Sequence, residues 1–304
     1  RNLKSDDARL TPDVCAVISA EETFTLKNTL GLDLSHSSNM ICAMASSIAR
    51  DGDHASVGSG LRWGYGLDAL KADEIVLVED GEIPSALEEV ISRYPDLHIV
   101  KLEKNLQLGR ALEAGLKACQ HELVARMDTD DIMMPSRLEK QYRFMMEHLE
   151  IAACGGDIAE FIEEGVILRE KHMPTSAHEL YRYGKKRNPL NHMTVMFRKS
   201  AIEAVGGYRH FPGLEDYDLW SRLLANGYRI ANIPEVLVQA RIGDRFASRR
   251  GGWAYFKHYL ELRKEQHRIG YLSTREYIVA CVLTFGMTVM PEKLRERAYA
   301  VLRK

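Results

Sequence analysis

Short apolar runs alternate with helical patterns over the middle of the chain. Strand-like runs lie at 74–78, 97–102, 121–127, 152–161, 193–197 and 230–239, and helical spacing occurs at 84–94, 109–119, 136–149, 199–205 and 214–226. Residues 163–173 are typical of an edge hairpin. This order predicts an α/β fold with a mostly parallel sheet flanked by helices, in which ligands bind beyond the carboxyl ends of the strands.

The first 70 residues lack this pattern. Between Leu30 and Gly66, glycine and serine are frequent and no period is sustained, apart from a short helix expected at 41–49. We therefore expect an atypical segment over 1–70, frame-shifted or disordered, then a main domain over 71–240 and a helical region over 241–304.

The helical region contains an apolar run of 14 residues, Tyr277 to Met290, which is too short to span a bilayer unaided. Residues 291–304 carry five basic and two acidic side chains, a net charge of +3. Two interpretations stay open: peripheral contact with an anionic membrane surface, or a packed C-terminal helix with a solvated charged face.

Composition narrows the class of protein. With 45% hydrophobic residues and a net charge of −2 over 304 residues, the chain is globular and has no bulk attraction to nucleic acid. Its five cysteines form no Cys-x-x-Cys pair, and an odd, scattered set is typical of a reducing compartment. We therefore expect a cytoplasmic protein.

Three carboxylates follow the apolar run at 121–127. Asp128, Asp130 and Asp131 would repel one another at a strand end, and Mg²⁺ or Mn²⁺ would remove that cost, with substrate phosphates completing the shell. The alternative is a solvated acidic turn or helix cap, because Asp131 and Ser136 both suit a cap before the next helix.

A second acidic group opens the helix at 214–226. Glu215, Asp216 and Asp218 lie in its first turn, where the helix dipole favours acids. A carboxylate held there beside Tyr217 and Trp220 is also suited to accept a proton from a substrate hydroxyl.

Five motifs together resemble the family-two inverting glycosyltransferases of the GT-A fold. They are Glu79-Asp80-Gly81, Asn105 with Gly109, Asp128-Thr129-Asp130-Asp131, Asn191-His192 and the run from Glu215 to Trp220. The resemblance spans about 73–240. It implies a Rossmann-like GT-A catalytic domain over 71–240, with a C-terminal helical appendage.

The resemblance also implies a role for each matching residue. Asp80, with Glu79, would contact the nucleotide base, Asp128 the ribose and diphosphate, and Asp130 the metal, with Asp128 beside it. Asn105, Gly109 and Arg110 would line the donor pocket. Asp216 would be the catalytic base and Glu215 would position acceptor or sugar. His192 and Trp220 would lie on the acceptor side or behind the site, with a structural role as the alternative.

The implied reaction moves a hexose, with inversion, from a UDP-sugar to an acceptor hydroxyl. A cell-surface polysaccharide or a lipid-linked glycan is the expected acceptor, and Mn²⁺ or Mg²⁺ the expected cofactor. Two alternatives are a catalytically impaired glycosyltransferase-like binding protein and a nucleotidyltransferase. The latter normally has a glycine-rich, basic loop after its first strand, and none is visible here.

Two departures from the family pattern stand out. Gln107 occupies a position where the family usually has glycine, which narrows the donor pocket or is tolerated. The family's first strand, part of the nucleotide clamp, is missing. Its nearest candidate, Val14 to Ser19, lies too far upstream and lacks the aromatic-Asn end. Either an unusual insertion replaces that strand or residues up to about Leu70 lie outside the native reading frame, and we expect the second.

Overall fold

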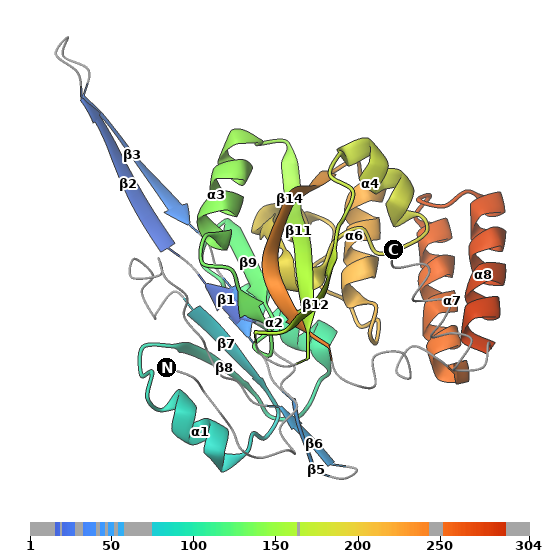
Figure 1. The fold of residues 1–304 in the computed structure, drawn as a ribbon, viewed down its shortest axis with the longest axis horizontal. Helices are drawn as coiled ribbons and strands as arrows, with labels where there is room; N and C mark the ends of the chain where they lie inside the picture. Colours follow the sequence, from blue (N-terminus) through green and yellow to red (C-terminus); the bar gives the residue numbers. More distant parts are fainter. Residues whose placement is uncertain are drawn as a thin grey trace.

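The computed structural model describes residues 75–162, 165–242 and 252–289, together with six strands within 16–57. A ten-stranded sheet runs through the molecule and helices cover it (Figure 1). The predicted α/β class, a sheet flanked by helices with C-terminal helices appended, is confirmed.

The strands of the main sheet follow the order β10-β14-β11-β13-β9-β1-β7-β4, with β8 beside β7 and β12 beside β11. Their bounds are β1 (Ala16–Ile18), β4 (Ala43–Ala45), β7 (Ile75–Asp80), β8 (His98–Leu102), β9 (Leu123–Met127), β10 (Ile132–Met133), β11 (Ile151–Phe161), β12 (Ile167–Lys171), β13 (Met196–Arg198) and β14 (Arg229–Arg241). Two separate hairpins pair β2 (Ala20–Lys27) with β3 (Asp33–Met40) and β5 (Ile48–Asp51) with β6 (His54–Val57).

The directions of the strands show which strand ends share an edge of the sheet. β7 pairs with β8, and β11 with β14, in parallel. β13 is antiparallel to both β9 and β11, and β1 is antiparallel to both β7 and β9. The sheet is therefore mixed and not mostly parallel as predicted, because β1 and β13 run against their neighbours, yet β7, β9, β11 and β14 all point the same way. Their carboxyl ends share one edge, where Asp80 and Asp128 lie.

Eight α-helices are described, together with a 3₁₀ helix at His192–Thr194. The α-helices are α1 (Ser85–Ile91), α2 (Leu108–Ala118), α3 (Arg137–Glu147), α4 (Ala177–Gly184), α5 (Lys199–Ala204), α6 (Glu215–Ala225), α7 (Gly252–Arg268) and α8 (Thr274–Val289). Sequence periodicity did not indicate α4. Its local signal is the N-cap Ser176, whose hydroxyl accepts from the Glu179 backbone N–H at 3.3 Å and donates to the Glu179 carboxylate at 2.8 Å.

The core lies between the sheet and its helices. All six residues of β7 and all eleven of β11 are buried, as expected for strands covered on both faces. α2 packs on β7 and β8, α3 on β11 and β14, and α6 on β14 and α7. The predicted edge hairpin over 163–173 is confirmed by the antiparallel pairing of β12 with β11.

The helix expected at 41–49 is wrong. That segment contains the strand β4 and the start of β5, and β4 pairs with β7 in the register Ala43 to Ile75. Pairing with an already buried strand overrides a weak local helix pattern. Part of the Val14 to Ser19 candidate forms β1, which fills the place between β7 and β9 but runs antiparallel to both.

Candidate active site

Asp80 ends β7 and holds the loop that leads into α2. Its Oδ1 accepts a hydrogen bond from the Leu106 backbone N–H at 2.6 Å, and the carboxyl is 4% exposed. Burial raises the pKa of Asp80, while the backbone donors at Leu106 and Gln107 oppose that rise. The neighbouring Glu79 is buried and pairs with Lys101 at 3.0 Å. The structure thus joins the Glu79-Asp80 motif to the Asn105 segment.

Gly81 lets these two segments approach each other. Its φ is +97°, and a Cβ there would stand 2.8 Å from the Asn105 backbone nitrogen. The Asn105 side chain in turn accepts from the Gln107 N–H at 3.0 Å, which shapes the turn before α2. A side chain at position 81 would push the two motifs apart.

Gln107 stands where the family usually has glycine, and its backbone shows why glycine suits the place. Its φ is 70° and its ψ is 160°, a region that side chains rarely adopt. Its carbonyl accepts from the Arg110 and Ala111 N–H groups at 3.1 Å, so α2 begins on this strained residue. The Gln107 and Arg110 side chains are both exposed.

Gly109 brings the start of α2 against the start of α6. A Cβ at Gly109 would lie 2.5 Å from the Arg209 carbonyl oxygen and 2.8 Å from Cγ of Glu215. The Asn105–Gly109 motif and the Glu215-Asp216 motif, which lie about a hundred residues apart in the sequence, therefore meet at van der Waals contact.

Arg126 is a buried cation beneath Asp128 that the sequence analysis did not single out. Its guanidinium donates to both carboxylate oxygens of Asp128, and it is 2% exposed. Its position on β9, two residues before Asp128 at the end of that strand, was the available signal, because alternate residues of extended chain share a face. The charge of Arg126 also lowers the pKa of Asp131 and of Glu215 against the effect of burial.

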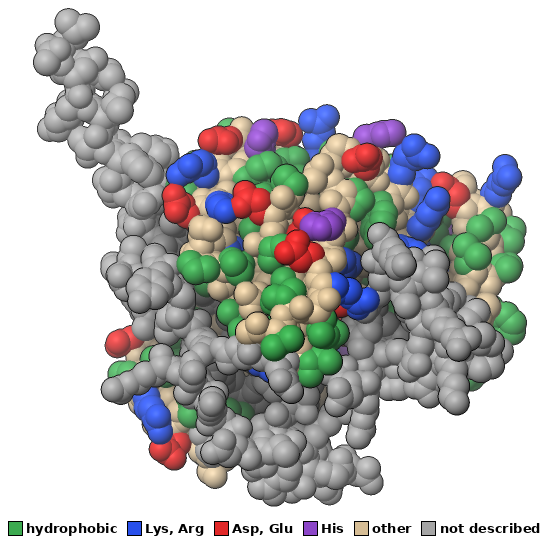
Figure 2. All heavy atoms as spheres, viewed as in Figure 1, with side chains coloured by type: hydrophobic (Ala, Val, Ile, Leu, Met, Phe, Trp, Pro, Cys, Tyr) green, Lys and Arg blue, Asp and Glu red, His purple; other side chains and the backbone are tan. Residues whose placement is uncertain are grey.

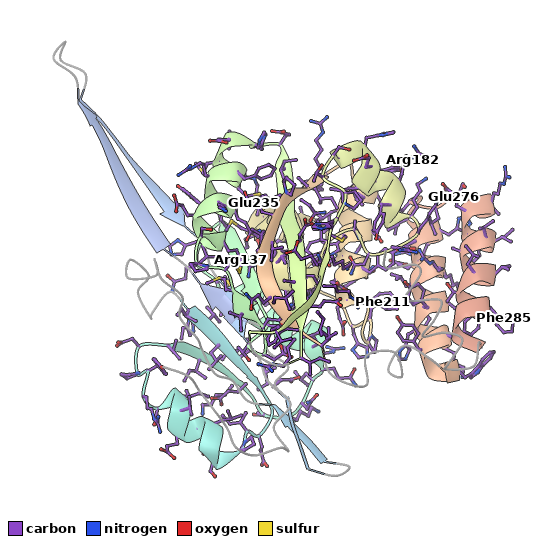
Figure 3. All side chains as sticks on the ribbon, viewed as in Figure 1. Arg137, Arg182, Phe211, Glu235, Glu276 and Phe285 are labelled. Atoms are coloured by element: carbon purple, nitrogen blue, oxygen red, sulfur yellow. The ribbon has the colours of Figure 1, made fainter. Side chains whose placement is uncertain are left out.

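Arg137 supports this strand end from the first turn of α3 (Figure 3). Its Nη2 donates to the Arg126 carbonyl at 2.7 Å and to the Val195 carbonyl at 3.2 Å, and its Nε donates to Gln141 at 2.8 Å. The side chain is fully buried, and burial lowers its pKa to about 9. It joins β9 to the segment before β13 where neighbouring backbone groups need donors.

The three acids at the end of β9 differ in environment. Asp128 and Asp130 are half-buried, whereas Asp131 is buried and its Oδ1 accepts from the Arg241 N–H at 2.7 Å. Burial, and then the charge of Asp128, raise the pKa of Asp131 well above its ordinary value. Asp131 Oδ2 is buried and has no hydrogen-bond partner among the described residues.

Asp128 and Asp130 fit a hard divalent cation with few protein ligands. No group of three or more His, Cys, Asp or Glu side chains suited to a metal occurs in the described part of the chain. Mg²⁺ sites commonly use one or two carboxylates and complete the shell with water and substrate phosphates. Two half-buried carboxylates at a strand end match that pattern, although both oxygens of Asp128 also accept from Arg126.

The start of α6 carries the second acidic group. Asp216 Oδ1 accepts from the Tyr217 N–H at 2.8 Å, and its Oδ2 accepts from the Asn188 side chain. Glu215 accepts from the Gly213 N–H at 3.2 Å, and burial raises its pKa to about 7. The role of Asn188 was missed by sequence reasoning, although it stands three residues before the Asn191-His192 motif.

His192 and Trp220 lie behind the acids. Trp220 is fully buried, and its ring meets that of His192 edge to face with centroids 6.2 Å apart. His192 Nε2 lies 3.0 Å from the Tyr208 hydroxyl, and burial, then the charge of Arg126, hold the pKa of His192 well below its ordinary value. This placement favours the structural role for both residues.

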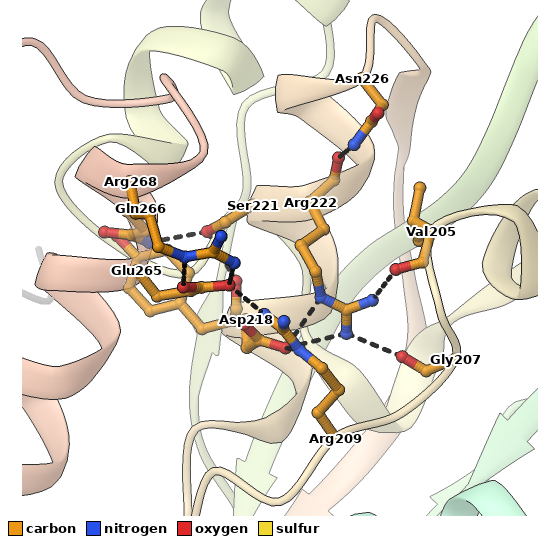
Figure 4. A network of polar contacts seen from close by, with 11 residues as sticks. Val205, Gly207, Arg209, Asp218, Ser221, Arg222, Asn226, Glu265, Gln266 and Arg268 are labelled. Carbon is orange, nitrogen blue, oxygen red and sulfur yellow. Dashed lines mark hydrogen bonds and ion pairs between the residues drawn. The ribbon is translucent and has the colours of Figure 1, made fainter.

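A buried ionic network anchors the far side of α6 (Figure 4). The Asp218 carboxylate accepts hydrogen bonds from Arg222 at 2.8 Å and from Arg209 at 3.0 Å. Arg209 also forms an ion pair with Glu265 of α7 at 2.9 Å. Hydrogen bonds from Arg268 and then Arg209 lower the pKa of Glu265 to about 2, against the opposing effect of burial. Asp218 is thus a structural acid, while Glu215 and Asp216 face the α2 side and Asn188.

Comparison with known proteins identifies the family of the chain. Residues 61–205 match the family model "Glycosyl transferase family 2". "Amylovoran biosynthesis glycosyltransferase AmsE" of Erwinia amylovora is 40% identical over 241 residues, covering 77% of this chain and 89% of that protein.

A second relative is an Escherichia coli protein named "UDP-Gal:alpha-D-GlcNAc-diphosphoundecaprenol beta-1,3-galactosyltransferase". It is 35% identical over 239 residues, covering 76% of this chain and 86% of its own length. Among solved structures, S. aureus TarS 1-349 in complex with UDP-GlcNAc has a TM-score of 0.47 at 16% identity, covering 72% of this chain and 68% of that one. By its similarity to AmsE and to the galactosyltransferase, the chain belongs to glycosyl transferase family 2 and is a glycosyltransferase.

Proposed function

We propose that this chain transfers a hexose from a UDP-sugar to an acceptor hydroxyl, with inversion at the anomeric carbon. The observation that carries the proposal is the contact between the starts of α2 and α6. Gly109 places the loop held by Asp80 directly against Glu215. A donor site and a proton acceptor can therefore act on the same substrate atoms.

The donor half comprises Asp80, Asn105, Gly109, Arg110 and Asp128. Asp80, with Glu79 behind it, would accept from the nucleotide base, and the half-buried Asp128 would receive the ribose and diphosphate end. The exposed Arg110 on the first turn of α2 adds a cation at the same end of the helix, where partial positive charge also favours an anion.

The leaving nucleoside diphosphate carries charge that must be neutralised. Asp130, with Asp128, would hold Mn²⁺ or Mg²⁺, which when bound supplies Lewis-acid stabilisation of the diphosphate. We assign Asp131 no direct contact with the cation, because it is buried and its Oδ1 already accepts from the Arg241 N–H.

Asp216 would accept the proton of the acceptor hydroxyl. Its two oxygens are oriented by the Tyr217 N–H and by Asn188, which leaves the carboxylate fixed at the helix start. Glu215, with its pKa near 7, would position acceptor or sugar as a hydrogen-bonding group beside it. A single displacement by the activated hydroxyl inverts the anomeric centre.

The acceptor is proposed to be a cell-surface polysaccharide intermediate or a lipid-linked glycan, made in the cytoplasm at the inner membrane face. The names of the two relatives, an amylovoran biosynthesis enzyme and a transferase acting on GlcNAc-diphosphoundecaprenol, support this class. UDP-Gal, the donor in the second name, is the first donor to test.

The test is a donor screen with and without Mn²⁺, using GlcNAc-diphospho-lipid as acceptor and proton NMR to read the anomeric configuration of the product. We expect transfer from a UDP-hexose, an inverted product, and strong loss of transfer after chelation or in Asp130→Ala. Equal turnover by Asp130→Ala without added metal would contradict the proposed cation role.

Donor binding without transfer, to any acceptor in the screen, would instead favour a catalytically impaired binding protein. Segment 1–70 bears on that alternative, and we propose that it lies outside the native reading frame. Translation of the underlying DNA in its two other frames tests this. If neither frame yields a Val-rich strand ending in an aromatic-Asn turn, the proposal fails.

A further inference from the structure

α8 is apolar on every side yet packs by one side alone. It has no charged residue from Tyr277 to Val289. Its packing contacts are mainly with α7, Glu276 in its first turn pairs with Lys185 at 2.9 Å, and no described helix is long and apolar enough to cross a membrane. Helices that are hydrophobic all round are normally buried in a protein core or in lipid.

The open side of α8 exposes large hydrophobic residues. The exposed fractions are 56% for Ile278, 50% for Val279, 65% for Val282, 64% for Leu283 and 47% for Phe285. The spacing of three and four residues places them on one face of the helix. Hydrophobic side chains gather at the edge of the molecule formed by α8 (Figure 2), and Phe285 lies at that edge (Figure 3).

The exposed surface continues onto α7 through aromatic contacts. Phe285 meets Phe256 with ring centroids 5.5 Å apart, and Phe256 meets Trp253 at 5.1 Å. Trp253 is 60% exposed. We call the set Trp253, Ile278, Val279, Val282, Leu283 and Phe285 the α8 face. Contiguous exposed apolar surface of this kind marks an interaction site.

The charge of the segment that follows α8 indicates which kind of partner the α8 face binds. Residues 291–304, which follow α8 directly in the sequence, carry a net charge of +3. A twofold contact between two copies would bring identical faces and like-charged tails together. An anionic bilayer instead accepts both features, because apolar side chains enter the acyl boundary, Trp sits at the headgroups and basic residues meet lipid phosphate.

We propose that the α8 face lies in the interface of an anionic bilayer and holds the enzyme there as a peripheral protein. The inference extends the proposed function, since it rests on a lipid-linked acceptor for its biological purpose. It also identifies which surface of the molecule meets the membrane: the outer side of α8 with the start of α7.

The test is flotation of the full chain with vesicles of phosphatidylcholine alone or with about 30% phosphatidylglycerol. We expect the chain to float with the anionic vesicles, and binding to fall at least about tenfold in the double variant Val282→Asp, Leu283→Asp. The matched control is Val166→Asp, Leu168→Asp, which changes two exposed apolar residues next to and within β12, 53% and 51% exposed. The control should float like the wild type.

Trp253 gives a second readout that does not depend on the charged variant. Its emission should shift to the blue when anionic vesicles are added, and Trp253→Phe should abolish the shift. Wild-type protein that stays unbound, or an α8 variant that floats like wild type, would overturn the proposal. So would light scattering that shows a dimer in the wild type and a monomer in the α8 variant, because the face would then be a self-association surface.

UDP binding, followed by calorimetry without vesicles, separates this inference from the proposed function. The α8 variant should bind UDP as tightly as the wild type. Loss of UDP binding in all proteins, with flotation intact, would count against the donor site and leave membrane docking standing.

Discussion

The starts of α2 and α6 meet at Gly109 but have opposite charge. Neither helix has a side-chain cap among the described residues. The first turn of α2 contains no acid and follows Gln107, whereas that of α6 contains Glu215, Asp216 and Asp218. An open helix start retains partial positive charge that suits a diphosphate, and an acidic one presents oxygens that suit a proton. One contact thus joins two chemically different half-sites.

The largest expected effect concerns Asp216, at the start of α6. Asp216→Asn keeps the shape of the side chain but removes its basicity, so kcat should fall by about 10²- to 10⁴-fold. Product formation under saturating UDP-sugar measures it. A variant that keeps more than half of wild-type kcat would show that the proton is taken elsewhere.

Asn188, which contacts Asp216, tests the same helix start. Its side chain donates to Asp216 Oδ2, and hydrogen bonds to charged groups contribute about 1.5 to 3 kcal/mol. Asn188→Ala should therefore lower kcat by about tenfold and move the acidic limb of the pH–rate profile upward, because the charged carboxylate loses a donor. A drop in kcat with an unmoved limb would indicate a purely structural role.

Glu215 gives a pH-dependent effect on stability. Burial raises its folded-state pKa to about 7 from an ordinary 4.5, so between these values the folded chain holds a proton that the unfolded chain has lost. Stability should then fall as pH rises from 4.5 to 7, by about 1.4 kcal/mol per unit of pKa difference at most.

Glu215→Gln removes that contribution. Its free energy of unfolding in urea, relative to wild type, should rise from pH 5 to pH 8, whereas Glu261→Gln at an exposed site of α7 should track wild type at both values. A parallel pH dependence for Glu215→Gln and wild type would mean that Glu215 is charged throughout.

The smallest expected effect concerns Gln107, at the start of α2. Gln107 holds φ at 70°, so Gln107→Gly should relieve strain and raise the free energy of unfolding by about 1 kcal/mol. Gln107→Ala is the control, since it removes the side chain and keeps the strain. Equal stabilisation by both variants would place the cost in the side chain instead of the backbone.

The sequence predicted the elements with strong local patterns to within a few residues. β7, β9 and β11 are buried runs, and α2 and α6 have clear apolar periods. The antiparallel direction of β13 and the pairing of β4 depend on distant strands, so no local pattern carried them. The short helix α4 has no sustained apolar period in the sequence. At residues 41–49 a weak helical pattern was overridden by the pairing of β4 with β7.

Sequence motifs singled out the acids of the candidate site but not the residues that contact those acids. Asp80, Asp128 and Asp216 stood out as motif residues, but Arg126 beneath Asp128 and Asn188 beside Asp216 are contacts made by folding. The repulsion among Asp128, Asp130 and Asp131 was expected to require a cation. The structure relieves part of it by pairing Asp128 with Arg126 and by raising the pKa of Asp131.

The division between the two helix starts is tested most directly by UDP binding in a matched pair of variants, Asp80→Asn and Asp216→Asn, measured by calorimetry with Mn²⁺ present. Asp80→Asn should weaken UDP at least about tenfold, because it disturbs both the proposed base contact and the Leu106 turn. Asp216→Asn should bind UDP within about twofold of wild type while failing to turn over. Weakened UDP in Asp216→Asn with intact binding in Asp80→Asn would contradict the account.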